Sequence, residues 1–182
     1  MGLKGKVAVV AGATRGAGRG IALALGEAGA KVWCVGRSSR ANRVKERGGP
    51  FELAQRPETV EDTADRCGGV PVIADLTDEA AVQALFERVG AFDVLVNDVW
   101  GGDALAEWGK PFWEQTPKKG FEMVDRVLRS HVLCAKYGAP RLRDGARKDE
   151  PFAFSETPLY VGRAVAALAA DPNVRALSLI HI

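Results

Sequence analysis

Short apolar runs alternate with amphipathic stretches along most of the chain. Four runs have the length and the β-branched content of buried strands: residues 6–12 (KVAVVAG), 31–36 (KVWCVG), 70–76 (VPVIADL) and 92–98 (FDVLVND). Residues 18–30, 58–67 and 77–89 separate these runs and have helical apolar spacing, and a further helix is expected from Pro117 to about Ala139. This alternation predicts a Rossmann-type, doubly wound α/β fold, with a parallel sheet and helices on both faces.

The apolar spacing also predicts which residues the helices present to their neighbours. In the first helix Ile21, Leu25 and Ala28 share one stripe, and Gly29 is expected to end the helix. Thr77 is expected to cap the helix over 77–89. The residues of that helix expected to face the core are Val82, Leu85, Phe86 and Val89. One side of the long helix carries Phe121, Val124, Leu128 and Val132.

Composition limits the classes of partner. The net charge of the 182-residue chain is only +2, which argues against nucleic acid or an anionic membrane as the main partner. Cys34, Cys67 and Cys134 are far apart in sequence, which favours a reduced protein, and two histidines argue against a metal site. The sequence has no apolar signal segment and no run long enough to span a bilayer, so a cytoplasmic protein is expected.

Candidate chemistry begins where the first strand meets the first helix, in AGATRGAGRG. Gly12, Gly16 and Gly18 allow a tight turn and a close approach to a pyrophosphate, and the helix N-terminus offers free N–H groups to an anion. The alternative is a purely structural turn. The alternating α/β context favours a dinucleotide site, formed here by Gly12, Thr14, Arg15, Gly16, Ala17 and Gly18.

The spacing Gly-x-x-x-Gly-x-Gly makes the chain resemble the short-chain dehydrogenase/reductase family, a Rossmann-fold family that uses NAD(P)(H). Asp75 and Leu76 match the family's acidic element near the adenine ring, and Asn97, in NDVWGG, matches its Asn-Asn-Ala-Gly element beside the cofactor. The resemblance runs from about residue 3 to 142. Ala11 departs from it, because the family usually has threonine there, whose hydrogen bond to the segment around Asn97 would be absent.

The end of the second strand bears on the choice of cofactor. An acidic residue there would hold a ribose 2′-hydroxyl and repel a 2′-phosphate, but this chain has Arg37 and Ser38, with Arg15 in the glycine turn. Two guanidinium groups suit a phosphate dianion, so NADP(H) is favoured over NAD(H). The alternative is that both arginines are solvated loop residues, which is also the interpretation of the basic residues Arg40, Arg43, Lys45 and Arg47.

The catalytic residues cannot be assigned from the sequence. The resemblance implies a serine, a tyrosine and a lysine four residues after the tyrosine, because the cation lowers the tyrosine pKa. No Tyr-x-x-x-Lys occurs in the chain. Tyr137 is followed by Pro140 and Arg141, and Tyr160 is followed by Arg163, which makes Tyr160 a candidate that we interpret as a packing residue.

Other parts of the family's catalytic pattern also lack a counterpart. Ser155 lies only five residues before Tyr160. The family has a fifth strand before its catalytic helix, but the corresponding stretch here, beginning RDGARKDE, is charged and contains no apolar strand run. Val127 stands where the family often has a helix asparagine, and His131 is interpreted as a packed or surface residue. Trp100, Trp108, Phe112 and Trp113 suggest either an apolar wall on the substrate side or loop packing.

The chain is therefore expected to contain a dinucleotide-binding core over 1–142, a charged linker over 143–155, and a C-terminal helix with an apolar tail over 156–182. The fold is expected to be incomplete in its C-terminal half, with an exposed sheet edge and uncovered apolar helix faces. Two functions remain open. The first is an NADP(H)-dependent oxidoreductase of a small carbonyl or alcohol, with a homo-oligomer as a candidate assembly. The second is a non-catalytic NADP(H)-binding module. A fold without any ligand is the remaining alternative.

Overall fold

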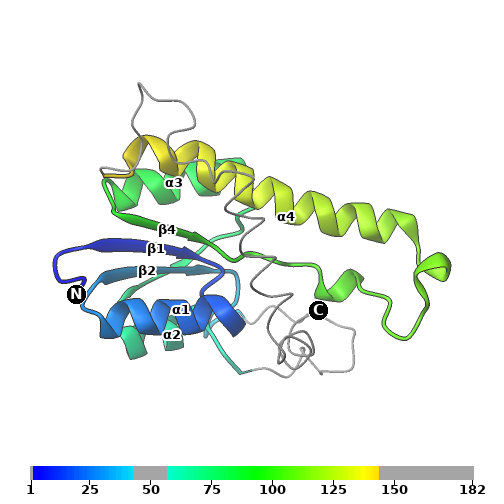
Figure 1. Ribbon diagram of the computed structural model, residues 1–182, viewed down its shortest axis with the longest axis horizontal. Coiled ribbons are helices and arrows are strands. Elements are labelled where there is room, and N and C mark those ends of the chain that lie inside the picture. Colours follow the sequence, from blue (N-terminus) through cyan, green and yellow to red (C-terminus); the bar gives the residue numbers. More distant parts are fainter. Residues whose placement is uncertain (1, 43–56, 144–182) are drawn as a thin grey trace, which may run out of the picture. The chain divides into compact units, whose positions relative to one another are not determined.

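The computed structural model describes residues 2–42 and 57–143, which lie within one compact unit, Met1–Ala146. Its centre is a four-stranded sheet in the order β3-β2-β1-β4, formed by β1 (Val7–Ala11), β2 (Lys31–Gly36), β3 (Val70–Ile73) and β4 (Val94–Asn97). Every pairing is parallel (Figure 1). The predicted strands are confirmed, although β1, β3 and β4 are shorter than the apolar runs that predicted them.

Helices cover both faces of the sheet, as the Rossmann-type prediction required. The helices are α1 (Gly16–Glu27), α2 (Val60–Cys67), α3 (Glu79–Val89) and α4 (Pro117–Gly138). Figure 1 shows α1 and α2 on one side of the strands and α3 and α4 on the other. Short 3₁₀ turns lie between β4 and α4, at Asp103–Leu105 and Phe112–Glu114, and directly after α4, at Ala139–Arg141. No helix in the described ranges is both long and apolar enough to cross a bilayer.

The sheet lies between two apolar clusters because β1 and β2 are apolar on both faces. Ala8, Val9, Val10 and Ala11 are all fully buried. Val10 and Cys34 pack toward α1 and α2, whereas Val9 and Val35 belong to the cluster that contains Phe86 of α3. Burial on both faces explains why these strands are continuously apolar instead of alternating.

Small residues bring α1 close to the sheet. The buried residues of α1 are Gly18 and Ala22, and Ile21 is 37% exposed. Ile21 therefore lies outside the core, whereas Leu25 of the same expected stripe packs against the cluster that contains Val10 and Ala22. Gly29, with φ of +95°, follows the helix and its amide donates to the carbonyl of Gly26, as expected for a glycine at a helix end.

The predicted N-cap of α3 is wrong by one residue. Asp78 is the cap, and its carboxylate accepts from the amide of Ala80 at 2.9 Å. Thr77 instead donates both its amide and its hydroxyl to Asp75 Oδ1, at 3.0 and 2.8 Å. Because Thr77 is engaged in this turn, the helix begins only after Asp78.

The edge of the sheet formed by β4 has few backbone partners among the described residues. Within the described residues β4 pairs only with β1, and a single bridge joins Phe92 to Leu142 beyond its start. The outer face of α4 is also uncovered. Its exposed apolar residues are Phe121 (75%), Val124 (55%), Leu128 (58%) and Val132 (62%). The apolar side predicted for this helix is thus real, but it faces away from the core of this unit.

Candidate functional site

The candidate site begins at the turn between β1 and α1. Gly12 has φ of +93°, and a Cβ at this position would overlap the backbone carbonyl of Asp98, which follows β4. A Cβ at Gly18 would overlap the carbonyl of Gly12 and lie 2.8 Å from the Asp98 side-chain Oδ2. Only glycine fits at these two positions, so the turn brings the first helix unusually close to the end of β4.

The N-terminus of α1 has the features of an anion site. Arg15 is its N-cap, no side chain caps the helix, and its first turn has no acidic residue. Gly16 has φ of +60°, and no atom lies within 4 Å of a Cβ placed there. A helix start of this kind offers backbone N–H groups and the positive end of the helix dipole to a phosphate. Gly16, Ala17 and Gly18 could therefore hold a pyrophosphate.

Two residues predicted to bind the cofactor meet in the structure. Arg15 Nη2 donates to the Ser38 hydroxyl at 3.2 Å, joining the glycine turn to the end of β2. Ser38 is buried, and Thr14 is also buried and packs against Gly36, the last residue of β2. A guanidinium beside a hydroxyl forms a suitable pair of donors for a phosphate.

Asp75 follows β3 and is a carboxylate within electrostatic range of Arg37 and Arg126. Partial burial alone would raise its pKa, but hydrogen bonds from the amide and hydroxyl of Thr77, together with the charges of Arg37 and Arg126, hold the pKa below its ordinary value. Asp75 therefore stays ionised at neutral pH. Leu76 differs from the other predicted residues, because its side chain lies in the core cluster with Phe86. Only its backbone could reach a ligand.

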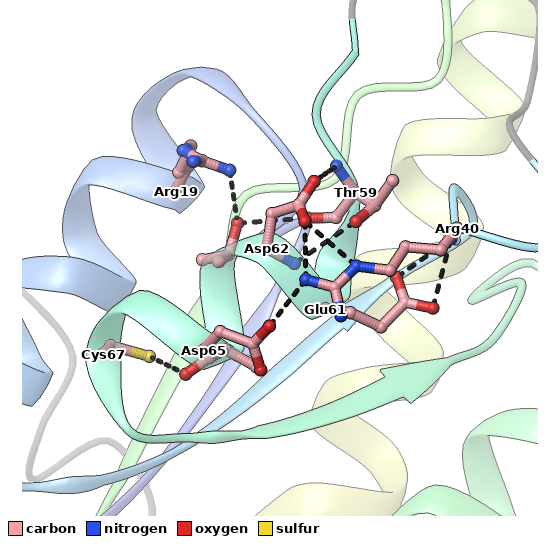
Figure 2. Close-up of polar contacts among 9 residues, drawn as sticks. Arg19, Arg40, Thr59, Glu61, Asp62, Asp65 and Cys67 are labelled. Carbon is pink, nitrogen blue, oxygen red and sulfur yellow. Dashed lines mark hydrogen bonds and ion pairs between the residues drawn. The ribbon is translucent and has the colours of Figure 1, made fainter.

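Arg40 is exposed to solvent and is held in place by polar contacts with α2. Its backbone amide donates to Glu61 at 3.2 Å, and its guanidinium donates to Asp62 at 2.8 Å and to Asp65 at 2.5 Å (Figure 2). Thr59 and Asp62 form a capping box at the start of the same helix. Arg40 is thus exposed, as expected for a solvated face, and it is also ion-paired to α2. Arg43, Lys45 and Arg47 lie outside the described residues.

Asn97 ends β4 opposite Ala11, as the strand register shows. Its Oδ1 is buried and has no hydrogen-bond partner among the described residues. Ala11, opposite it, has no hydroxyl that could donate to this oxygen. The adjacent Asp98 was not predicted as a site residue; its carboxylate lies against the glycine turn, and its amide donates to the Ala11 carbonyl at 2.9 Å.

The described residues include no catalytic pair around Tyr137. Its hydroxyl donates to Glu79 Oε1 at 2.7 Å, and Arg141 contacts its backbone carbonyl at 3.0 Å. His131 Nε2 lies 3.2 Å from the Val99 carbonyl and joins α4 to the segment after β4, while Val127 is half-buried. The candidates Ser155, Tyr160 and Arg163 lie outside the described residues.

The aromatic residues after β4 do not form a continuous wall. Trp108 lines a hollow of about 300 Å³ together with Glu107, Lys110 and Met123. Phe112 and Trp113 are instead 85% and 82% exposed. Trp100 is half exposed and donates its ring N–H to Asp103 at 2.8 Å. No group of histidine, cysteine and carboxylate side chains with the geometry of a metal site occurs in the described part of the chain.

Comparisons with known proteins agree with this geometry. The family model described as short chain dehydrogenase matches residues 6–148. The mouse protein named dehydrogenase/reductase SDR family member 1 is 41% identical over 145 residues, covering 75% of this chain and 42% of the mouse protein. L-xylulose reductase of Cavia porcellus is 36% identical over 137 residues, covering 75% of this chain and 47% of that protein.

Solved structures give the same fold. The Pseudomonas aeruginosa RhlG/NADP active-site complex superposes with a TM-score of 0.60 at 26% identity, covering 92% of this chain and 64% of that one. The chain thus spans about half the length of the relatives that it matches.

Proposed function

This chain belongs to the short-chain dehydrogenase/reductase family of oxidoreductases, and on that premise we propose that it forms an NADP(H)-binding core for chemistry on a small carbonyl or alcohol. The observation that carries the proposal is the 3.2 Å hydrogen bond between Arg15 and Ser38. It brings donors from two separate elements to the end of β2, where this family places the adenosine ribose. One structural relative is described as an NADP complex, which supports the same preference.

The proposed contacts divide between the two ends of the cofactor. The turn of Gly12, Gly16 and Gly18 would hold the pyrophosphate at the α1 N-terminus. Arg15, Arg37 and Ser38 would hold the 2′-phosphate, and the positive charge of the two arginines would favour a phosphorylated ribose over an unphosphorylated one. The other proposed contacts are Thr14, Ala17, Asp75, Leu76 and Asn97. When bound, the nicotinamide would supply or accept the hydride.

A second candidate function is NADP(H) binding without catalysis. It is favoured by the hydrogen bond of Tyr137 to Glu79, which occupies the hydroxyl of one of the two tyrosines of the chain. The other tyrosine, Tyr160, is not followed by a lysine at the family's spacing. On this alternative the chain would bind the cofactor as a module, and a reaction would require residues that it does not supply.

We also propose a division of the chain into segments, a partner and a cellular location. We propose a dinucleotide-binding core over 1–142, a charged linker over 143–155 and a C-terminal helix with an apolar tail over 156–182. A second copy of the chain is the proposed partner for the exposed apolar side of α4, where Phe121 is 75% exposed. A cytoplasmic location is supported by the three cysteines being free thiols.

The test of cofactor choice is a fluorescence titration with NADPH and with NADH. NADPH is expected to bind more tightly, and Arg15→Ala is expected to weaken NADPH binding about 10- to 100-fold while changing NADH binding little, since one charge-assisted phosphate contact is lost. Arg129→Gln is the matched control, because it removes an arginine that is paired with Asp125 within α4. No saturable binding of either nucleotide would overturn both candidate functions.

A turnover assay separates the two candidates. NADPH consumption with a panel of small carbonyl compounds is expected if the chain is an enzyme, and none is expected if it is a binding module. Loss of turnover in Tyr160→Phe would identify Tyr160 as the proton donor and refute our interpretation of it as a packing residue. The same variant should leave NADPH binding unchanged, which distinguishes a chemical role from a folding defect.

A further inference from the structure

Two cysteines that are far apart in sequence meet on the face of the sheet that α1 and α2 cover. Cys34 lies in β2 and Cys67 is the last residue of α2, and their Sγ atoms are 3.6 Å apart. A disulfide needs about 2.05 Å between sulfurs, so a movement of less than about 2 Å would join them. Cys134 belongs to the cluster on the opposite face of the sheet and does not take part.

Glycines allow this close packing at the end of α2. A Cβ at Gly26 of α1 would lie 2.6 Å from the Cβ of Cys67, and a Cβ at Gly69 would lie 2.9 Å from its sulfur. Neither position accepts a side chain without displacing Cys67. The Cys67 side chain is therefore confined between α1 and the chain entering β3, with its sulfur directed at Cys34.

The two thiols have different environments. Cys34 is fully buried, and burial, followed by the adjacent Cys67, raises its pKa, so Cys34 keeps its proton at neutral pH. Cys67 is only partly buried and donates its S–H to the Ala64 carbonyl at 3.5 Å, in the last turn of α2 (Figure 2). An oxidant from solvent therefore reaches Cys67 before Cys34.

We propose that Cys34 and Cys67 are an oxidisable dithiol that a peroxide converts into an intramolecular disulfide. The Cys67 thiolate attacks one peroxide oxygen, the O–O bond breaks, and Cys67 sulfenic acid forms with release of hydroxide. The Cys34 sulfur then attacks the Cys67 sulfur, the S–O bond breaks, and the departing hydroxide takes the Cys34 proton as water. Two thiols and one hydrogen peroxide thus give one disulfide and two waters.

The cross-link would close a loop that carries part of the candidate cofactor site. Residues 35–66 lie between the two cysteines and include Arg37, Ser38 and Arg40. Closing this loop restricts the unfolded chain, so the oxidised protein is expected to unfold at a temperature roughly 5–10 °C higher than the reduced one. Disulfide formation does not depend on cofactor binding. The two sulfurs lie on the face of the sheet that α1 and α2 cover, and not at the end of β2 where the cofactor is proposed to bind.

The test is oxidation of the purified full chain with hydrogen peroxide near one equivalent. Free thiols, counted after denaturation, are expected to fall from three to one. Non-reducing peptide mass spectrometry should then show one cross-link joining Cys34 to Cys67, with the loss of two hydrogen atoms, and dithiothreitol should reverse it. The thermal midpoint of the oxidised protein should be the higher of the two.

Two single variants make the assignment specific. Cys134→Ser is expected to form the same disulfide, whereas Cys67→Ser is expected to keep its two remaining thiols. The change at Cys67 replaces a partly buried side chain by one of similar size, so folding is preserved and can be verified by circular dichroism. Over-oxidation of Cys67 with Cys34 still a thiol would overturn the proposal, and so would a cross-link through Cys134.

Discussion

Asn97 Oδ1 is a buried acceptor for which the described residues supply no donor. Ala11 lies directly opposite in the register of β1 and β4, so a hydroxyl added to its Cβ is on the same side of the sheet. A buried acceptor without a donor costs about 1–3 kcal/mol, and part of this is recovered when a hydrogen bond forms. The alanine at this position therefore leaves Asn97 less well fixed than a hydroxyl residue would.

Ala11→Ser is expected to raise the free energy of unfolding by about 1 kcal/mol, because the new hydroxyl donates to Asn97 Oδ1. The measurement is urea unfolding of both proteins. Ala8→Ser is the matched control: Ala8 is also fully buried in β1, but its partner in β4 is Val94, so its hydroxyl would be unpaired. The free energy of unfolding of this control should fall by about 1–3 kcal/mol. An equal fall in both variants would contradict a hydrogen bond between residue 11 and Asn97.

At the scale of the elements, Arg40 connects the segment after β2 to the first two turns of α2. The contacts to Glu61, Asp62 and Asp65 all come from α2, whereas Ser38 in the same segment contacts Arg15. Ser38 also accepts the amide of Val60 through its backbone carbonyl at 3.0 Å. These contacts fix the position of Ser38 in the absence of a ligand.

Arg40→Gln is expected to loosen this segment without unfolding the sheet. The ion pairs are exposed, so the expected change is modest, with amide hydrogen exchange of residues 38–42 faster by roughly two- to fivefold. Arg129→Gln again serves as the control, because its ion pair with Asp125 lies within α4. Unchanged exchange in 38–42 would show that the Ser38 contacts alone hold the segment.

The loop between β4 and α4 depends on one carboxylate. Hydrogen bonds from Lys110, then from the amide of Thr116, lower the pKa of Glu107 to about 2, against an ordinary value of 4.5. Because the bound form is the ionised one, this contribution is complete above about pH 4.5 and is lost as the pH falls through about 2. The loop should therefore loosen in acid before the sheet unfolds.

The tryptophan fluorescence of the chain, which includes Trp108 next to Glu107, should report this loosening as a change between about pH 4.5 and about 2. In Glu107→Gln the loop is expected to be loose already at neutral pH, so the acid change should disappear. Glu114→Gln removes an exposed carboxylate from the same loop, and this variant should still show the acid change in fluorescence. An acid change that persists in Glu107→Gln would refute the role of this carboxylate.

The elements themselves were largely predictable, whereas contacts between elements were not. β2 was predicted with its observed bounds because burial on both faces gives a continuous apolar run that ends at glycine. The Thr77 cap was wrong because Asp75, two residues earlier, competes for the same threonine. The Cys34–Cys67 contact follows from the packing of α2 on β2, and no local pattern signals it.

At the scale of the whole molecule, the described unit is a sheet whose two faces are covered by helices and whose β4 edge is open. β1 and β2 are enclosed by helices, whereas β4 has only the bridge at Phe92 on its outer side within residues 2–42 and 57–143. The outer side of α4 adds an apolar stripe formed by Phe121, Val124, Leu128 and Val132. Exposed apolar surface of this kind favours association over a stable monomer.

Association through α4 gives a prediction that separates a surface effect from a folding effect. Leu128 is 58% exposed, so Leu128→Lys should keep the helix and its core contacts while placing a charge in the apolar stripe. The original chain is expected to elute as a dimer or larger species in size-exclusion chromatography with light scattering, and Leu128→Lys is expected to shift toward the monomer. Gln83→Lys adds the same charge to the exposed side of α3 and should leave the mass unchanged. If all three proteins have the monomer mass, the stripe does not mediate self-association, and if both lysine variants shift equally, net charge and not the α4 surface controls it.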